Sequence, residues 1–317
     1  EVTRQRILKI ARDVGYQNSP IMSSVMGQVA RSRKIDYSIP IMMLVDWDPN
    51  KAKMNPAQEE YLSSAMMKAR SLGFRVEVQG HASSRLSDRR INEILETRGI
   101  QGVVINVANN DPWELHLNWD RLCAVTTGGR LLNPRHLPRI LSDLPQMLGR
   151  TLHELSLRGY RRIGFCYAAK VDRILNGFYE LPGYFRMFHE YHRSRVGKRQ
   201  QIPLYEISGS SPEGSFRKWV ERYKPDVIVS TFHGTGSWLT EMGISTPGDV
   251  GFVSLGVKEM GGDISGMYLS KGSISAIAVD SVINRLMKRD YGMNALQVRT
   301  LVPGIWNPGK TIRHPST

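Results

Sequence analysis

The stretch that decides the fold is IPIMMLVDWDPNKAKMNPAQEEYLSSAMMKARSLGF, residues 39–74. It opens with an unbroken apolar run, IPIMMLV, which has the length and composition of a strand buried on both faces. The second half, from Pro56 to Gly73, has the spacing of an amphipathic helix, with proline at its start and glycine at its end. A buried strand followed by a helix is the repeating unit of a parallel sheet, so this stretch predicts an α/β protein.

The same alternation continues along the chain. Further β-branched or apolar runs predict strands at RVEVQ (75–79), GVVINV (102–107), CAVTT (123–127), RIGFCYA (162–168), PLYEI (203–207), DVIVST (226–231), DVGFVSL (249–255) and VRTLV (298–302). Helices are predicted between them at 87–99, 144–160, 183–194, 213–223, 234–243 and 274–292. Two series of such units indicate two doubly wound parallel-sheet subdomains. Ligands of such folds bind in a cleft outside the carboxyl ends of the strands.

The charge balance is strongly basic, with 43 Lys and Arg against 29 Asp and Glu, a net charge of +14 over 317 residues. Such a balance favours an anionic partner, and nucleic acid is the usual one. The positive residues are spread along the chain rather than gathered in one run, which leaves a generally basic protein as the alternative.

Cysteine usage and apolar runs bear on location. Cys123 and Cys166 each lie in an apolar segment, which predicts reduced, buried residues of a cytosolic protein rather than a disulfide or a metal site. No apolar run approaches the ~18 residues of a membrane helix, and the first residues do not have the pattern of a signal peptide. We therefore expect a cytoplasmic protein without metal, cofactor or membrane contact. Because the sequence does not start with Met, we also expect residues ahead of Glu1.

The N-terminal 37 residues differ from the rest. TRQRILKIARDVGY (3–16) predicts a helix with Thr3 as N-cap and Gly15 just past its end. Pro20 breaks this helix, and an apolar, small-residue run leads to the basic segment RSRK (31–34). This front end is too short to form a core of its own.

Four stretches, in order along the chain, resemble lactose-repressor-type (LacI/GalR) transcription regulators. TRQRILKIARDVGY followed by QNSPIMSSV is similar to the end of the helix-turn-helix head and the hinge of that family. HELSLRGYRRIGF (153–165), PDVIVSTFHG (225–234) and GISTPGDVGFVSLG (243–256) are similar to three segments of its effector-binding core. The resemblance extends over essentially the whole chain, and its most specific parts are the head-to-hinge junction and the third core segment.

The resemblance implies a core like that of type I periplasmic sugar-binding proteins, behind a DNA-binding head whose first two helices lie before Glu1. It implies a head remnant and hinge at 1–37, a first subdomain at 38–135 and 267–295, and a second at 136–266 and 296–317. It further implies a ligand-responsive regulator, by expectation a repressor, that binds a palindromic operator as a homodimer.

The hinge of this family enters the minor groove with an apolar wedge that partly unstacks a base step. By resemblance Val25 occupies the wedge position, with two methyl branches in place of a longer leucine; the alternative is that Val25 and Met26 are simply apolar linker residues. The residues expected to contact DNA are Arg4, Ser23, Ser24, Val25, Met26, Arg31 and Arg33.

Effector contacts in the family come from loops at the strand ends on both sides of the cleft. By resemblance these positions are Asp46, Trp47, Asn106, Gly128, Arg130, Asp172, Arg173, Phe232, His233 and Lys258. Trp47 suits stacking on a sugar ring, because an indole has an apolar face and a polar edge.

Three positions depart from the sugar-binding pattern. Phe232-His233 stands where relatives carry Asn-Asp, Lys258 where they carry the Asp of Gly-Phe-Asp, and Glu180 where they carry an Arg. Lysine only donates hydrogen bonds whereas a carboxylate only accepts, so the changed wall favours an acceptor-rich ligand such as a sugar acid or sugar phosphate. Two alternatives are that His233 and Lys258 turn to solvent while Phe232 reshapes the pocket, and that effector binding is lost.

Other functions find weaker support. GIWNPGKT (304–311) matches the phosphate-binding P-loop pattern, but no helix fits in the residues that follow, so Lys310 and Thr311 are expected to be surface residues of the tail. His189 and His192 are three apart rather than four, which favours a solvated helix face over a metal site. No catalytic constellation is found. A solute-binding protein of the same fold without a role on DNA stays open as the alternative function.

Overall fold

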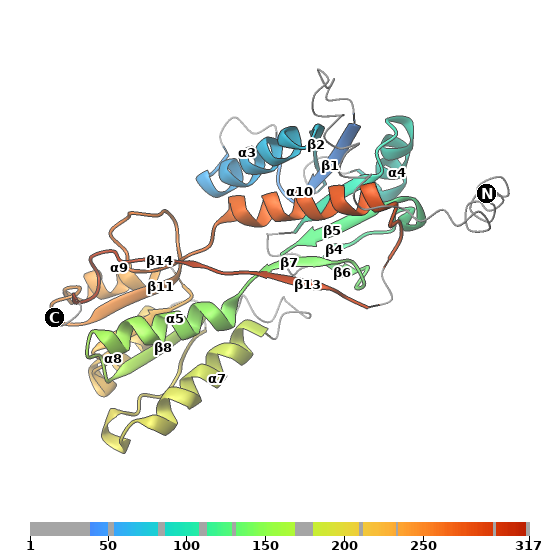
Figure 1. Ribbon diagram of the computed structural model, residues 1–317. Coiled ribbons are helices and arrows are strands. Elements are labelled where there is room, and N and C mark those ends of the chain that lie inside the picture. The colour runs from blue at the N-terminus through green and yellow to red at the C-terminus, as the bar shows by residue number, and fades with distance from the viewer. Residues whose placement is uncertain are drawn as a thin grey trace, which may run out of the picture.

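The computed structural model describes residues 39–49, 54–81, 86–107, 113–128, 131–168, 180–208, 212–232, 234–293 and 296–314. The predicted head, hinge and DNA-contacting residues lie outside these ranges. The described chain forms two lobes, each built on a six-stranded sheet, as Figure 1 shows.

The first sheet has the order β13-β7-β5-β3-β1-β2, and every neighbouring pair is parallel. Its strands are β1 (Ile39–Val45), β2 (Phe74–Gly80), β3 (Gly102–Asn106), β5 (Cys123–Thr127), β7 (Arg139–Ser142) and β13 (Arg299–Val302). Helices α3 (Pro56–Ser71) and α10 (Lys271–Lys288) cover one face, and α4 (Asp88–Thr97) covers the other. Ile41 and Met43 face the first pair of helices while Met42 and Leu44 face α4, which is why this strand is apolar throughout.

The second sheet has the order β14-β12-β11-β10-β8-β9. Its strands are β8 (Ile163–Ala168), β9 (Tyr205–Ile207), β10 (Val227–Ser230), β11 (Gly251–Val257), β12 (Gly266–Tyr268) and β14 (Ile305–Asn307), of which only β14 runs antiparallel to its neighbour. One face packs against α5 (Leu144–Leu157) and α7 (Glu180–Arg195), and the other against α8 (Glu213–Tyr223) and α9 (Gly234–Glu241). The predicted α/β class with two doubly wound subdomains is confirmed.

Smaller elements lie at the edges. A two-stranded parallel ribbon joins β4 (Trp113–Glu114) and β6 (Leu131–Asn133). Single-turn 3₁₀ helices are η1 (Trp119–Arg121) and η2 (Lys198–Gln200). The predicted start of α3 is confirmed in detail: Asn55 Oδ1 accepts from the Gln58 N–H at 2.9 Å, and Gln58 Oε1 accepts from the Asn55 N–H at 3.0 Å.

The chain passes between the lobes after β7, after β12 and after β13. The crossings after β7 and β13 come later than the predicted subdomain boundaries at residues 136 and 296, whereas the crossing after β12 falls next to the predicted boundary at 267. Strands β7 and β13 pair in parallel with each other and extend the first sheet, whereas β12 pairs with β11 in the second. Hydrophobic periodicity identifies a strand but does not say which sheet it joins.

Two local expectations are corrected. His189 is buried rather than solvated, and its Nε2 lies 2.7 Å from the Ile202 carbonyl oxygen, because this face of α7 packs on β8.

In the tail, Lys310 is exposed as expected and pairs with Asp263 at 2.8 Å. Thr311 is instead half-buried, and its hydroxyl donates to the Phe252 carbonyl at 2.6 Å, so it anchors the tail to β11. Cys123 and Cys166 are free and buried, as predicted.

Candidate functional site

The carboxyl edge of the first sheet carries a cluster of polar side chains. Val45, Asn106 and Thr127 are register partners on β1, β3 and β5, so the residues at and after these strand ends come together. Asn106 Nδ2 donates to Thr127 Oγ1 at 2.7 Å, and the Thr127 and Tyr61 hydroxyls share a hydrogen bond of 2.8 Å. Asp46 follows β1 directly and is buried. We call Asp46, Trp47, Tyr61, Asn106 and Thr127 the first wall.

Burial dominates the electrostatics of this wall. It raises the pKa of Tyr61 to about 12, against the opposing effect of the hydrogen bonds with Thr127 and Asn106, and the Asp46 carboxylate adds to the rise. The Tyr61 phenol is therefore neutral at physiological pH and serves as a fixed hydrogen-bonding group.

The indole nitrogen of Trp47 and the amide oxygen of Asn106 are buried and have no hydrogen-bond partner among the described residues. Trp47 meets Tyr61 edge-on, with ring centroids 6.0 Å apart and planes at 84°. Buried polar groups are normally paired, so a donor and an acceptor left open at one sheet edge suit a ligand that carries hydroxyl groups.

Gly128 has a structural reason to be glycine. Its φ is +75°, and a Cβ there would lie 2.7 Å from the Val107 carbonyl oxygen. Its place at the carboxyl end of β5 is as predicted, but the backbone alone explains the residue type.

The second lobe contributes a different surface, which we call the second wall and define by Phe232 and Lys258. Phe232 follows β10, is 37% exposed and packs on Trp238 with ring centroids 5.2 Å apart. Lys258 follows β11 and is exposed. Both lie at strand ends as predicted. The other predicted effector contacts, Arg130, Asp172, Arg173 and His233, lie outside the described residues.

A contact between the lobes involves Glu60, which precedes Tyr61 of the first wall along the chain. Glu60 of α3 accepts hydrogen bonds from the Tyr268 hydroxyl at 2.6 Å, the Ser270 hydroxyl at 3.2 Å and the Gly272 N–H at 3.0 Å. Tyr268 ends β12 in the second sheet, so this carboxylate ties the first lobe to a crossover segment. Burial lowers the pKa of the neighbouring Lys271, and its attraction to Glu60 opposes the shift.

The sequence reasoning missed Tyr61, Thr127 and Glu60. Thr127 could have been found, because it ends the predicted strand CAVTT at the ligand-binding edge. Tyr61 and Glu60 had no such signal, since their partners Thr127 and Tyr268 are 66 and 208 residues away along the chain.

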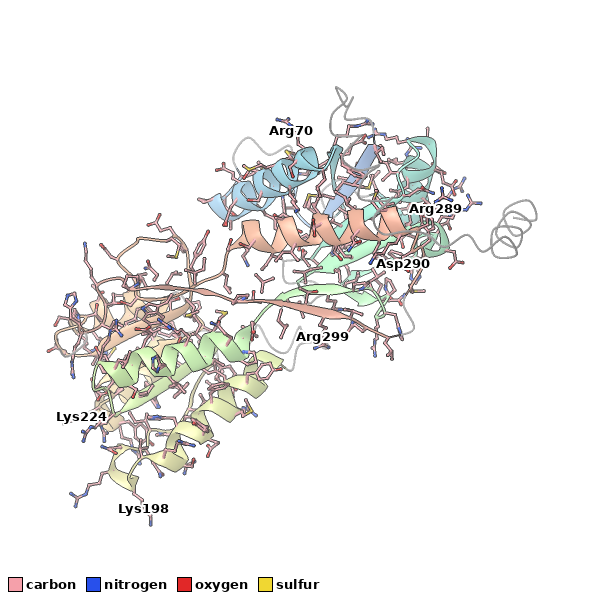
Figure 2. All side chains as sticks on the ribbon, viewed as in Figure 1. Arg70, Lys198, Lys224, Arg289, Asp290 and Arg299 are labelled. Carbon is pink, nitrogen blue, oxygen red and sulfur yellow. The ribbon has the colours of Figure 1, made fainter. Side chains whose placement is uncertain are left out.

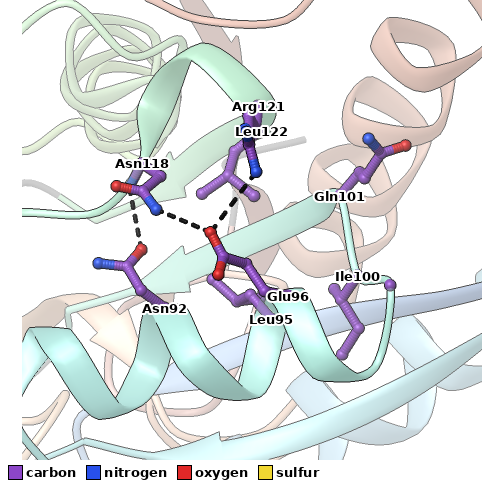
Figure 3. Close-up of a pocket in the computed structure, with 9 residues that line it drawn as sticks. Asn92, Leu95, Glu96, Ile100, Gln101, Asn118, Arg121 and Leu122 are labelled. Atoms are coloured by element: carbon purple, nitrogen blue, oxygen red, sulfur yellow. Dashed lines mark hydrogen bonds and ion pairs between the residues drawn. The ribbon is translucent and has the colours of Figure 1, made fainter.

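A hollow of about 270 Å³ lies elsewhere, on the outer face of the first lobe between α4 and η1 (Figure 3). Its polar groups bond to one another: the Asn118 N–H donates to Asn92 at 2.9 Å, and Asn118 Nδ2 donates to Glu96 at 3.0 Å. None of the predicted site residues lines it. Within the described ranges, no helix has the length and apolar character needed to span a membrane, and no acidic, histidine or cysteine cluster could hold a metal ion.

The fold is similar to that of LacI-family transcription regulators. A LacI-family transcriptional regulator from Rhizobium etli superposes with a TM-score of 0.62 at 15% identity, over 87% of this chain and 100% of that one. The lac repressor dimer bound to operator and the anti-inducer ONPF gives 0.56 at 13% identity, over 93% of this chain and 99% of that one. The complex of the regulator CelR with cellobiose gives 0.54 at 13% identity, over 93% and 92%.

No family model and no curated protein matches the sequence. At these identities the likeness establishes the fold alone, which is the two-lobed α/β fold of LacI-family regulators. The predicted resemblance in fold is therefore confirmed.

Proposed function

We propose that this protein is a cytoplasmic, ligand-responsive transcription regulator that binds operator DNA as a homodimer and a small carbohydrate-like effector between its lobes. The observation that carries the proposal is the first wall, with its open donor on Trp47 and open acceptor on Asn106 at the ligand-binding edge of this fold. The sugars and operator bound by proteins of similar fold support it. The head remnant and the basic balance of the sequence favour DNA as the partner.

DNA binding is tested with the protein of the complete gene and the DNA upstream of that gene. Binding should be saturable, specific and weaker at higher salt, because contacts to phosphate release counterions. Absent or salt-insensitive binding across candidate operators overturns the DNA role. A ligand response without DNA binding would favour a solute-binding protein.

The effector is proposed to be rich in acceptors, a sugar acid or a sugar phosphate. Lys258 and His233 stand where relatives carry acceptors, and charge-assisted hydrogen bonds are roughly twice as strong as neutral ones. Thermal-shift measurements with glucose, glucuronic acid and glucose phosphate test this, since a ligand bound only by the native state raises the melting temperature. Stabilisation by glucose alone would contradict it.

A charge swap makes the test specific to the second wall. Lys258→Asp restores the acceptor that relatives carry and should shift the preference from the acidic sugars to glucose. Lys218→Asp, an exposed lysine on α8, is the matched control and should leave the preference unchanged.

A further inference from the structure

The second lobe carries a cluster of exposed cations at the end of its sheet opposite the candidate site. The cations come from three segments. These are the two residues that precede β8, the end of α7 together with η2, and the end of α8. We call this cluster the distal basic surface, and its exposed members are Arg161, Arg195, Lys198, Arg199, Arg222 and Lys224. Figure 2 labels Lys198 and Lys224 at this end of the lobe.

Arg162 holds the three segments together. Its guanidinium group donates to the carbonyl oxygens of Arg199 and Tyr223, and to that of Lys224 at 3.0 Å. This partly buried guanidinium group therefore places the backbone of η2 beside the end of α8, and the cations that these segments carry share one surface.

These cations are not neutralised by their surroundings. Within the described ranges, none of the six forms an ion pair. Two carboxylates near these segments are engaged by other groups: Asp226 accepts from the backbone N–H groups of Arg161 and Arg162 at 2.9 and 3.0 Å, and Glu190 pairs with Arg193 at 3.3 Å. Cations of the first lobe such as Arg98, 2.6 Å from Glu77, contrast with this.

Two guanidinium groups of the surface lie over aromatic rings. Arg195 lies 4.3 Å from the ring centroid of Tyr191, and Arg222 lies 5.4 Å from that of Tyr223. A guanidinium group that lies over a ring still has N–H groups that can donate to phosphate oxygens.

Lys224 occupies a backbone conformation that is unfavourable for its residue type. It ends α8 in the left-handed region at φ +43°, where α3, α5 and α9 are followed by Gly73, Gly159 and Gly243. A residue with a Cβ is strained in that conformation. The chain thus carries a cation at a position where glycine would be the more stable choice.

The chemistry of the surface selects its partner. A protein interface normally has an apolar core. On the adjoining helix α7 the large exposed apolar side chains are Met187 and Tyr191, and two side chains do not make such a core. The phosphate backbone of a nucleic acid needs only unpaired cations on the protein, because their binding releases the counterions condensed on the phosphates. We propose that the distal basic surface binds the phosphate backbone of a nucleic acid, independently of the effector and of the predicted head.

The test uses the full chain and a triple reversal, Arg195→Glu with Lys198→Glu and Arg199→Glu, which leaves Arg162 in place. The matched control reverses Arg70, Arg135 and Lys288, three exposed cations of the first lobe, and so makes the same change in net charge. Binding of a labelled random single strand and of a random duplex is followed by fluorescence anisotropy over a range of salt concentrations, after melting curves confirm that both variants fold.

The distal reversal should weaken single-strand binding roughly tenfold or more at low salt and reduce the salt slope by about 2, since each lost phosphate contact removes about 0.7. The control should keep the wild-type slope. Equal losses in both variants would show an effect of net charge alone and overturn the proposal. The proposal would also be overturned if the distal reversal abolished binding of polyglutamate but not of nucleic acid, because the partner would then be an acidic protein. Thermal shifts by glucose and its acids report on the cleft separately, and should be the same in wild type and in both variants.

Discussion

The two walls at the carboxyl ends of the sheets are built differently. In the first wall, Thr127 lies between Tyr61 and Asn106, and all three side chains are buried and fixed by hydrogen bonds. In the second wall, Phe232 and Lys258 project from strand ends with much of their surface exposed. A site with one rigid wall and one exposed wall can keep its mode of binding on the first and alter its specificity on the second. The positions that depart from the sugar-binding pattern of LacI/GalR regulators all fall on the second lobe, as this division requires.

The largest effect is expected for Thr127→Val. The substitution keeps the shape but leaves Tyr61 and Asn106 without their shared partner. An unsatisfied buried polar group costs about 1–3 kcal/mol, so the free energy of unfolding of the first lobe should fall by about 3 kcal/mol. Urea unfolding followed by tryptophan fluorescence measures it.

The neighbouring Thr126→Val is the matched control. Thr126 is fully buried, and its hydroxyl has no partner among the described residues, so its loss should be neutral or stabilising. Equal losses from the two substitutions would mean that the hydrogen bonds of the first wall do not hold it.

Glu60→Ala tests whether this carboxylate ties the two lobes together. It removes one acceptor from three donors on the crossover segment and should cost about 2 kcal/mol. Hydrogen exchange should also increase at the start of α10. Glu59→Ala, the exposed neighbour in the first turn of α3, should cost no more than about 0.5 kcal/mol through the helix dipole. Unchanged exchange in Glu60→Ala would show that the lobes are held elsewhere.

Alkaline pH tests the first wall through Tyr61. Its folded pKa of about 12 lies above the ordinary value near 10, so the neutral phenol stabilises the fold below pH 10, and this contribution is lost as the pH rises towards 12. Tyr61→Phe should cost about 1 kcal/mol at neutral pH and should flatten the fall in stability within that window. Parallel pH profiles for wild type and Tyr61→Phe would contradict the buried, hydrogen-bonded phenol.

Whether the sequence predicts a residue of this site depends on how far apart along the chain the contacting residues lie. The resemblance predicts Asp46, Asn106, Phe232 and Lys258, and each lies at or next to the carboxyl end of a strand whose apolar run is visible in the sequence. The Tyr61–Thr127 and Glu60–Tyr268 contacts depend on how separate elements pack, which no local pattern records. The same limit explains the sheet assignment of β13, at the edge of the first sheet, and of β7 beside it, since a strand joins a sheet by pairing rather than by composition.

The smallest change in stability is expected for Phe232→Ala, and it tests the comparison most directly. The ring is 37% exposed and packs mainly on Trp238, so its loss should lower the free energy of unfolding by no more than about 1 kcal/mol. If the second wall determines specificity, the thermal shift produced by the preferred sugar should nevertheless change strongly. Met260→Ala, at a similarly exposed position of the same lobe, should alter neither quantity. A loss of several kcal/mol with unchanged ligand response would make Phe232 a core residue, and the division between a rigid wall and a variable wall would fail.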